Sequence, residues 1–366
     1  MFADSTRISV RRWNQAILED RSGLFFSLFR LCCRIVSLPY RWITTLRRRL
    51  YRTGLLRTRA VRARVISVGN ITIGGTGKTP LVALLADRLA KDGLRPVILT
   101  RGYGRRSSET VVLPDETIDW KQAGDEPVMM SRALPEVPIV VSANRVAAAQ
   151  IAWDRFHPKV LLLDDGMQHL RMRRDLEIVT IDATHPLEGE KIFPAGRLRE
   201  ALPALRQADL FVLTRTEQST WTETVSNFLA RYHSRAAQVR SVIRPRDLRE
   251  LSGSCRRPLE SLRDQPVLAF SGIGNPEALE YSLTTLGARV VGHLSFPDHH
   301  PYTRRDVQRI ERRARDLGAR VIVTTEKDAV RLKESDCRDI PFLALSIQIE
   351  ITSGAENFWR TVTGGD

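Results

Sequence analysis

The stretch Val65-Ile-Ser-Val-Gly-Asn-Ile-Thr-Ile-Gly-Gly-Thr-Gly-Lys-Thr-Pro-Leu-Val82 decides the fold. It begins with a β-branched run, Val65 to Val68, that is typical of a buried strand, and apolar residues recur at helical spacing from Leu81 onward. A glycine-rich loop joins the two. This order predicts a P-loop, in which backbone N–H groups and a helix N-terminus surround phosphate oxygens.

The loop also predicts the nucleotide-binding residues. Lys78 would reach the β- and γ-phosphates, the Thr79 hydroxyl would ligate Mg²⁺, and the loop residues around ATP would be Ile73, Gly74, Gly75, Thr76 and Gly77. Thr72 stands where the pattern G-x-x-x-x-G-K-[ST] has its first glycine, so the Gly74–Gly75 pair must provide the loop's freedom. A plain flexible turn is the alternative. We favour nucleotide binding because Gly-Lys-Thr opens a helix directly after a strand.

A second motif supports the first. Val160-Leu-Leu-Leu-Asp164-Asp165 has the form of a Walker B strand, whose acid holds Mg²⁺ directly or through water. Apolar strands often end in Asp at a turn, so the weight comes from the combination with Gly-Lys-Thr. Further apolar runs predict strands at 96–100, 138–142, 177–182, 210–214, 289–294, 321–325 and 342–345, with another that starts at 266. A helix ending near His233 and then a polar stretch separate the two groups of strands.

The alternation of strands and helices predicts an α/β fold of the P-loop NTPase type: a doubly wound, mainly parallel sheet with a second, smaller α/β lobe. We expect three parts: an N-terminal amphipathic membrane-associating segment (1–60), a P-loop core (61–215) and a smaller C-terminal α/β lobe (216–366). The nucleotide would lie between or beside the lobes, where closing motions usually act.

The N-terminal segment is unusually basic. Residues 1–64 hold 15 arginines, no lysine and three acidic residues, which makes +12 of the chain's net charge of +15. Polar residues recur there at steps of three and four, with apolar residues on the other side of the predicted helix: Ser27, Arg30, Arg34, Ser37 and Arg41 against Leu24, Phe25, Leu28, Leu31, Cys32, Ile35 and Leu38. This pattern favours a helix in the plane of an anionic lipid surface. The alternative is a surface helix whose apolar side packs on its own domain.

The same segment is too polar to cross a bilayer. Arg30 and Arg34 interrupt it, so no uncharged apolar run approaches the roughly 20 residues that a spanning helix needs. We expect Pro39 to kink or end the helix.

Phosphoryl transfer also needs a base near the acceptor hydroxyl. The candidates are Asp125 and the cluster Phe296-Pro-Asp298-His299-His300. Each has an alternative interpretation: Asp125 as a helix N-cap, Asp298 and His299 as a hydrogen-bonded pair, and His299 and His300 as a metal pair or turn residues. No third imidazole or cysteine at ligand spacing supports zinc. The four cysteines form no C-x-x-C, which favours reduced thiols.

Several motifs together resemble those of the tetraacyldisaccharide 4′-kinase family, the lipid A kinases of Gram-negative-type envelopes. In chain order they are Gly69–Pro80, Thr100-Arg-Gly-Tyr-Gly104, Gly124-Asp-Glu-Pro127, Asp164-Asp-Gly-Met-Gln-His169, Pro194-Ala-Gly-Arg-Leu-Arg-Glu200, Gly272-Ile-Gly-Asn-Pro276, Phe296-Pro-Asp-His-His300 and Thr324-Thr-Glu-Lys-Asp-Ala329. They extend from about residue 65 to 330. Two positions depart from the family pattern: Arg197 replaces a proline, and Met167 stands where an aromatic is usual.

The resemblance implies an ATP-dependent lipid kinase that phosphorylates the 4′-hydroxyl of tetraacyldisaccharide 1-phosphate, giving lipid IVA, at the cytoplasmic face of the inner membrane. It implies Asp125 as the base with His299 paired to it, alongside Lys78. The Mg²⁺ residues would be Thr79, Asp164, Asp165 and Glu200, with either aspartate as the direct ligand. Contacts to phosphate or sugar would come from Asn144, Arg145, Gln168, His169 and Arg199. We expect ATP and Mg²⁺ as cofactors, the lipid substrate and an anionic membrane surface as partners, no nucleic acid, and a monomer.

Two other functions were weighed. A P-loop NTPase acting as a switch or assembly factor could use the basic arm on nucleic acid. The arginines, however, are interleaved with an apolar face for which nucleic acid has no use. A lipid-bound scaffold without activity is the other possibility, and the presence of Lys78, Asp125 and Asp165 argues against it.

Overall fold

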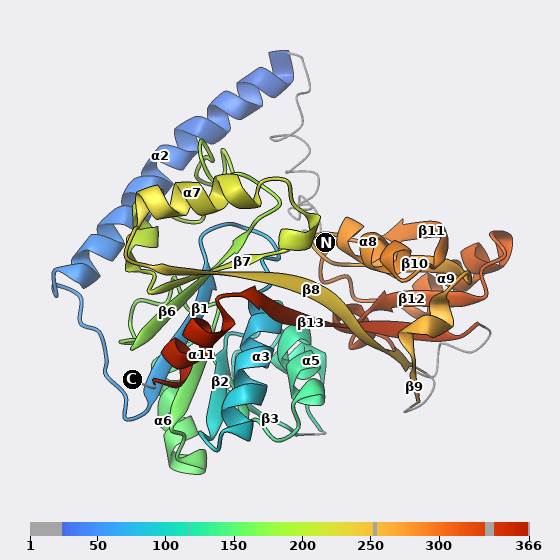
Figure 1. Ribbon diagram of the computed structural model, residues 1–366, viewed down its shortest axis with the longest axis horizontal. Helices are drawn as coiled ribbons and strands as arrows, with labels where there is room; N and C mark the ends of the chain where they lie inside the picture. Colours follow the sequence, from blue (N-terminus) through green and yellow to red (C-terminus); the bar gives the residue numbers. More distant parts are fainter. Residues whose placement is uncertain (1–23, 116, 252–254, 334–339, 365–366) are drawn as a thin grey trace.

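The computed structural model describes residues 24–115, 117–251, 255–333 and 340–364. The predicted membrane-associating segment before Leu24 lies outside these ranges, as does Cys337. One sheet runs through the whole molecule in the order β11-β10-β12-β13-β8-β7-β6-β1-β5-β2-β4-β3, with β9 paired to β8. Figure 1 shows a larger part around β1 and a smaller part around β10–β12, joined by the long strands β8 and β13.

Each strand predicted from an apolar run is present. The strands are β1 Arg64–Asn70, β2 Pro96–Thr100, β3 Val111–Leu113, β4 Ile139–Val141, β5 Val160–Asp164, β6 Leu176–Asp182, β7 Leu210–Thr214, β8 Ala237–Glu250, β9 Arg256–Arg257, β10 Pro266–Ser271, β11 Arg289–Ser295, β12 Val321–Thr325 and β13 Phe342–Ser353. The α-helices are α2 Leu24–Arg52, α3 Lys78–Lys91, α4 Trp120–Ala123, α5 Asp125–Ala133, α6 Arg145–Phe156, α7 Thr222–Tyr232, α8 Glu277–Thr285, α9 Arg304–Asp316, α10 Glu326–Ala329 and α11 Ala355–Thr363. Short 3₁₀ turns are η1 Leu202–Gln207, η2 Thr216–Gln218 and η3 Leu259–Leu262.

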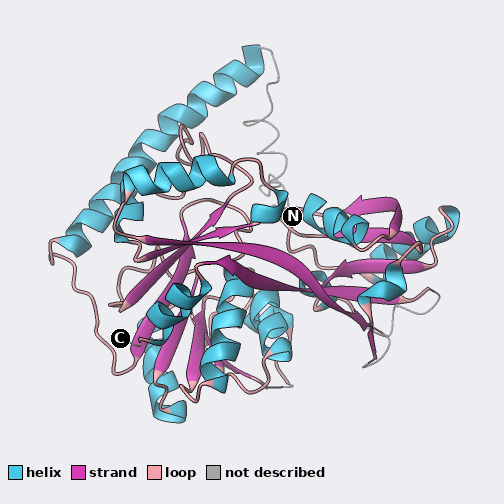
Figure 2. Cartoon of the chain, in the orientation of Figure 1, coloured by secondary structure: helices cyan, strands magenta, loops and turns pink. Residues whose placement is uncertain are grey.

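Helices cover both faces of the sheet, as Figure 2 shows. Successive residues of a strand point to opposite faces, so Ile66 and Val68 of β1 share a core with α3, α5 and α11. Val65 lies in the core that includes α6, and the core under α7 is built on β6 and β7. In the smaller part α9 and α8 cover opposite faces. The predicted doubly wound, mainly parallel sheet is therefore confirmed.

Strand β8 was not predicted, because residues 237–250 were interpreted as a polar stretch. It pairs parallel with β7 at its start and antiparallel with β13 over most of its length. Its side chains alternate irregularly between buried and exposed, since its second half is only partly covered by other elements. An apolar run was therefore the wrong signal to look for. Strand β13, predicted only to Leu345, continues to Ser353 as its partner.

The end of the chain returns to the P-loop helix. Phe358 and Val362 of α11 are fully buried in the core that contains Leu81 and Leu85 of α3. Arg64, at the start of β1, donates a hydrogen bond from Nη2 to the Thr361 carbonyl at 2.9 Å. Helix α11 thus supports the element that begins at the nucleotide-binding loop.

Helix α2 continues through Pro39 to Arg52, so the expectation that it ends at Pro39 is wrong. Proline removes one backbone donor and leaves the carbonyl of residue i−4 without its partner. Both Ile35 and Pro39 are exposed, so that carbonyl is accessible to water. Within the described ranges, none of the helices combines the length and apolar character needed to cross a bilayer.

We expect Phe358→Ala to lower the free energy of unfolding by about 3–5 kcal/mol, because it leaves a cavity against the P-loop helix. Chemical denaturation followed by circular dichroism measures this. Tyr281→Ala is the control, since Tyr281 is 44% exposed and its loss should cost no more than about 0.5 kcal/mol. Equal losses for the two variants would contradict the packing role of α11.

Candidate active site

The P-loop is held against the ends of β6 and β7. Thr76 is buried, and its hydroxyl lies 2.8 Å from that of Thr180, while Thr214 Oγ1 donates to the Thr76 carbonyl at 3.0 Å. Gly77 has a φ of +79°, and an added Cβ would lie 3.3 Å from the Thr214 side chain. The residue before α3 must therefore be glycine, and the loop has a defined shape.

The rest of the predicted nucleotide loop is open or tied from outside. Gly74 and Gly75 are exposed. Ile73 donates its backbone N–H to the Arg197 carbonyl at 2.8 Å. The loop thus presents its glycine backbone to the surface, above the start of α3.

Asp165 is the anion that the P-loop lysine contacts. Lys78 Nζ lies 3.5 Å from Asp165 Oδ1, and Arg199 binds the same carboxylate with two hydrogen bonds of 2.7 and 3.0 Å. Burial would raise the pKa of Asp165, but Lys78 and Arg199 lower it to about 2. Asp165 also has a φ of +53°, a conformation that non-glycine residues adopt mainly under constraint. The structure therefore brings Lys78, Asp165 and Arg199 together.

Asp164 lies beside this group in a more apolar position. It is only 4% exposed and accepts a hydrogen bond from Thr100 Oγ1 at 3.0 Å. Burial, together with the negative charges of Glu126 and Asp165, raises its pKa to about 7. Thr79 Oγ1 donates to Glu126 Oε2 at 3.3 Å. Glu126, which was not among the predicted site residues, thus links the P-loop to the buried carboxylates.

Asp125 and His299 meet across 174 positions of sequence. His299 Nδ1 lies 2.8 Å from Asp125 Oδ2, whereas Asp298 Oδ2 is 3.7 Å from the other ring nitrogen. Asp125 is 3% exposed and stands inside α5, whose N-cap is Gly124. The structure therefore favours the Asp125–His299 pair over the N-cap and Asp298 alternatives. His300 instead contacts Asp306.

Two cations from the smaller part complete the surroundings of Asp125. Lys327 Nζ lies 2.9 Å from Glu126 Oε1 and 3.4 Å from His299 Nε2. The fully buried Arg331 guanidinium is 3.6 Å from Asp125 Oδ2. Burial would raise the pKa of Asp125, but the His299 hydrogen bond and the charges of Lys327 and Arg331 hold it below its usual value. The motif Thr324–Ala329 contains Lys327, but its sequence alone did not indicate this role.

The predicted substrate residues lie in the loops around Asp164. Arg145 is buried and donates to the carbonyls of Ser142, at 2.7 Å, and Asp164, at 3.4 Å. Gln168 donates to the Asn70 carbonyl at 3.0 Å, and Asn144 caps α6. Among the described residues, three buried polar atoms of this group have no hydrogen-bond partner: Arg145 Nε, Gln168 Oε1 and His169 Nε2. Buried polar atoms left unpaired in a protein call for a ligand or water.

Burial also affects His169. Burial itself, with the nearby charges of Arg145 and Arg174, lowers its pKa to about 4. The imidazole is therefore neutral at physiological pH, and its ring nitrogens can accept as well as donate.

Glu200 pairs with α2 rather than with the P-loop group. Its Oε2 lies 2.6 Å from the Arg48 guanidinium. In the described part of the chain, no group of three or more His, Cys, Asp or Glu side chains is arranged to hold a metal ion. This arrangement differs from the predicted set of Mg²⁺ residues in the position of Glu200.

Both departures from the family pattern fit the structure. Arg197 pairs with Glu190 at 2.8 Å, and its N–H donates to the same carboxylate at 3.0 Å, a bond that proline could not make. Met167 packs against the end of β1, where an added Cβ on Gly69 would lie 2.4 Å from its Cβ. Neither residue removes a group from the site.

Comparison with known proteins identifies the family. The model described as tetraacyldisaccharide-1-P 4′-kinase matches residues 29–363. The chain belongs to this family. It is 38% identical to the tetraacyldisaccharide 4′-kinase of Halothermothrix orenii, covering 87% of this chain and 88% of that one. It is likewise 38% identical to that of Syntrophus aciditrophicus, covering 91% of each.

A solved structure supports the same assignment. The crystal structure of LpxK from Aquifex aeolicus in complex with ATP matches with a TM-score of 0.71 at 30% identity, covering 91% of this chain and 99% of that one. The resemblance drawn from the motifs is therefore confirmed, and so is the prediction of a phosphotransferase with an alcohol acceptor.

The raised pKa of Asp164 predicts a pH-dependent stability in the ligand-free protein. The folded carboxyl keeps its proton up to about pH 7, whereas the unfolded one ionises near 4. Its contribution is thus present below about pH 4 and is lost as pH rises through about 7. The free energy of unfolding of wild type minus that of Asp164→Asn should therefore fall by on the order of 4 kcal/mol over this window.

Urea unfolding at a series of pH values measures this difference. Asp298→Asn, at a half-buried position, is the control and should show no such change. A difference between wild type and Asp164→Asn that is constant with pH would contradict the raised pKa.

Proposed function

We propose that this chain transfers the γ-phosphate of ATP to the 4′-hydroxyl of tetraacyldisaccharide 1-phosphate, the lipid A precursor, giving lipid IVA. Family membership and the ATP-bound relative support this reaction. The observation that carries it is the buried Asp125–His299 pair beside the P-loop, to which Glu126 and Thr79 connect it. A base next to a phosphate-binding loop is what transfer to a hydroxyl requires.

Asp125 is the base in this reaction. Its pKa is held below its usual value, so the carboxylate is ionised at neutral pH and accepts the acceptor's proton as the new O–P bond forms. His299 orients the carboxylate through Nδ1. Lys327 binds Glu126 and contacts His299, and so positions both neighbours of the base.

The P-loop would bind the phosphates of ATP. The backbone N–H groups of residues 74–79 and the N-terminus of α3 supply donors. Lys78, which pairs with Asp165 at 3.5 Å, would turn to the β- and γ-phosphates. Arg199 holds Asp165 by two further bonds, so the carboxylate stays ordered when Lys78 leaves it.

The donors near the P-loop suit Mg²⁺. Thr79, Asp164 and Asp165 offer oxygen atoms, which this hard cation prefers, and it usually takes only one or two carboxylates together with substrate phosphates. The raised pKa of Asp164 reflects the crowding of negative charge there, which a dication would offset. Bound Mg²⁺ would neutralise charge on the β- and γ-phosphates. Glu200 would have to leave Arg48 to join this set.

Asn144, Arg145, Gln168, His169 and Arg199 are proposed contacts to the sugar or phosphate groups. The three unpartnered buried atoms of Arg145, Gln168 and His169 support this assignment. Every residue assigned a role comes from one chain, so a monomer suffices.

Helix α2 is proposed to lie on the cytoplasmic face of the inner membrane. Its apolar side chains Leu28, Leu31 and Ile35 are 54%, 51% and 58% exposed. They do not pack on the protein's own core, in contrast to the alternative considered for this helix. A contiguous exposed apolar surface flanked by arginines suits a lipid surface.

The first test is a mixed-micelle assay with Mg²⁺-ATP and tetraacyldisaccharide 1-phosphate, with the lipid analysed by mass spectrometry. Wild type should add one phosphoryl group, and Lys78→Ala should not. Asp125→Asn should lower turnover by about 10²–10⁴-fold, the usual effect of removing a general base, while ATP binding stays close to wild type. Asp298→Asn is the matched control and should keep most activity. Equal loss of turnover and ATP affinity in Asp125→Asn would rule out the base role.

A second test addresses the membrane. Replacing Leu28, Leu31 and Ile35 together by Ser should release the protein from sedimenting phospholipid vesicles, because the apolar surface that enters the lipid is lost. The control is Tyr281→Ser with Ile347→Ser, which removes exposed apolar side chains from other elements. If the α2 variant sediments like wild type, the helix does not attach the protein to lipid.

A further inference from the structure

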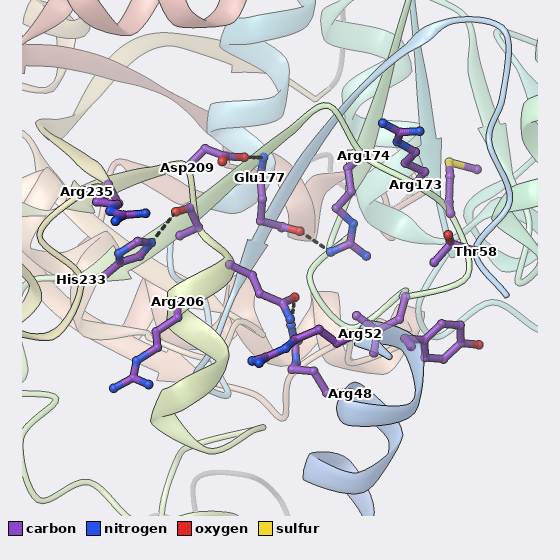
Figure 3. Close-up of a pocket in the computed structure, with 16 residues that line it drawn as sticks. Arg48, Arg52, Thr58, Arg173, Arg174, Glu177, Arg206, Asp209, His233 and Arg235 are labelled. Atoms are coloured by element: carbon purple, nitrogen blue, oxygen red, sulfur yellow. Dashed lines mark hydrogen bonds and ion pairs between the residues drawn. The ribbon is translucent and has the colours of Figure 1, made fainter. Parts of the chain in front are cut away.

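A second concave site lies away from the nucleotide loop. A cavity of about 640 Å³ opens between the last turns of α2 and the segments that precede β6, β7 and β8 (Figure 3). Strands β1, β6, β7 and β8 run parallel where they pair, so these segments mark the amino edge of the sheet. The P-loop and Asp164 follow the carboxyl ends of β1 and β5. The cavity is therefore distinct from the candidate active site.

The cavity is strongly basic. Six arginines from four segments of the chain line it, against two carboxylates: Arg48, Arg52, Arg173, Arg174, Arg206 and Arg235, with Glu177 and Asp209. Both carboxylates are already engaged. Glu177 pairs with Arg174, and Asp209 Oδ2 accepts the Glu177 backbone N–H at 2.7 Å. The cavity thus has an excess of positive charge that its own acids do not offset.

Four of the arginines remain for a ligand. Arg48 is bound to Glu200, and Arg174 to Glu177. Within the described ranges, no carboxylate forms an ion pair with the others, which are all exposed: Arg52, Arg173, Arg206 and Arg235. Figure 3 shows them on different sides of the cavity, Arg52 on α2 and Arg206 on η1.

Parts of the wall are fixed in advance. The Arg206 guanidinium stacks 5.5 Å from the centre of the Tyr232 ring. Arg174 also donates to the carbonyls of Gly166, at 3.1 Å, and His169, at 2.6 Å. His233 Nε2 lies 3.1 Å from the Ala208 carbonyl. Side chains held in place before binding lose less entropy when a ligand arrives.

We propose that this cavity binds the phosphate group of an anionic ligand. Guanidinium groups recognise phosphate oxygens with paired hydrogen bonds, and several converging arginines are the usual means of holding a doubly charged anion. The phosphate has two possible sources, an anionic lipid headgroup or a soluble phosphorylated molecule. The position of the cavity at the end of α2 suits a headgroup, and its opening to water suits either. The site does not depend on the kinase reaction.

Pyrophosphate is the soluble probe, measured by isothermal titration calorimetry. Because the P-loop also binds phosphate, the protein is first saturated with a non-hydrolysable ATP analogue and Mg²⁺, and the titration is repeated with Lys78→Ala. Wild type should bind one further pyrophosphate. Arg206→Gln with Arg235→Gln should weaken this binding by about tenfold or more. Both side chains are exposed, so thermal unfolding should stay unchanged.

Arg309→Gln with Arg312→Gln, on the exposed side of α9, is the control with the same loss of charge and should bind like wild type. No pyrophosphate binding, or equal weakening in the two double variants, would overturn the proposal. Failure of the ATP analogue to bind would instead count against the proposed kinase function.

Vesicles distinguish the source. Sedimentation is compared on pure phosphatidylcholine and on phosphatidylcholine with phosphatidylglycerol. If the pocket variant loses both pyrophosphate binding and the preference for anionic vesicles, while the α9 control keeps them, the ligand is a lipid headgroup. Loss of pyrophosphate binding alone assigns the site to a soluble phosphate.

Discussion

The neutralisation of buried carboxylates at one edge of the sheet is the constraint on which the rest of the structure depends. Asp125, Glu126, Asp164 and Asp165 gather there, and an unpaired buried charge costs several kcal/mol. Each cation that offsets them comes from a different place in the chain. Lys78 follows the P-loop, Arg199 comes from the loop before η1, and Lys327 and Arg331 come from the smaller part. The smaller part therefore belongs to the site electrostatically as well as by position.

That dependence explains which parts of the structure the sequence could predict. Strands buried on both faces appear as apolar runs, so β1, β5 and β7 were predicted close to their observed bounds. β8 is covered unevenly and carries arginines at exposed positions, so no periodic pattern marked it. Pro39 was weighed by the backbone bond it removes, but an exposed helix can leave the freed carbonyl to water.

The site divides in the same way. Lys78 and Thr79 follow from a local motif, since the strand, loop and helix that shape the P-loop are continuous in sequence. The approach of His299 to Asp125 is not local, and only the family resemblance suggested it. Glu126 and Lys327 carried no signal beyond their motifs, because an ion pair between a helix start in one part and a short helix in the other depends on how β8 and β13 join the two. Glu200 lies beside the predicted residue Arg199 in sequence, yet its partner is an arginine of α2.

Helix α2 shows why the count of arginines alone was an incomplete guide to function. The basic N-terminal segment suggested a single anionic partner met by a single segment. In the structure its arginines have different tasks. Arg47 and Arg48 reach the loops after β5 and before η1, where Arg47 donates to the Gln168 carbonyl at 3.1 Å, and Arg34 and Arg41 stay exposed. Arg52 joins arginines from three other segments around the basic cavity. Because strand pairing assembles that cavity, neither charge counts nor helical periodicity in the sequence could have located it.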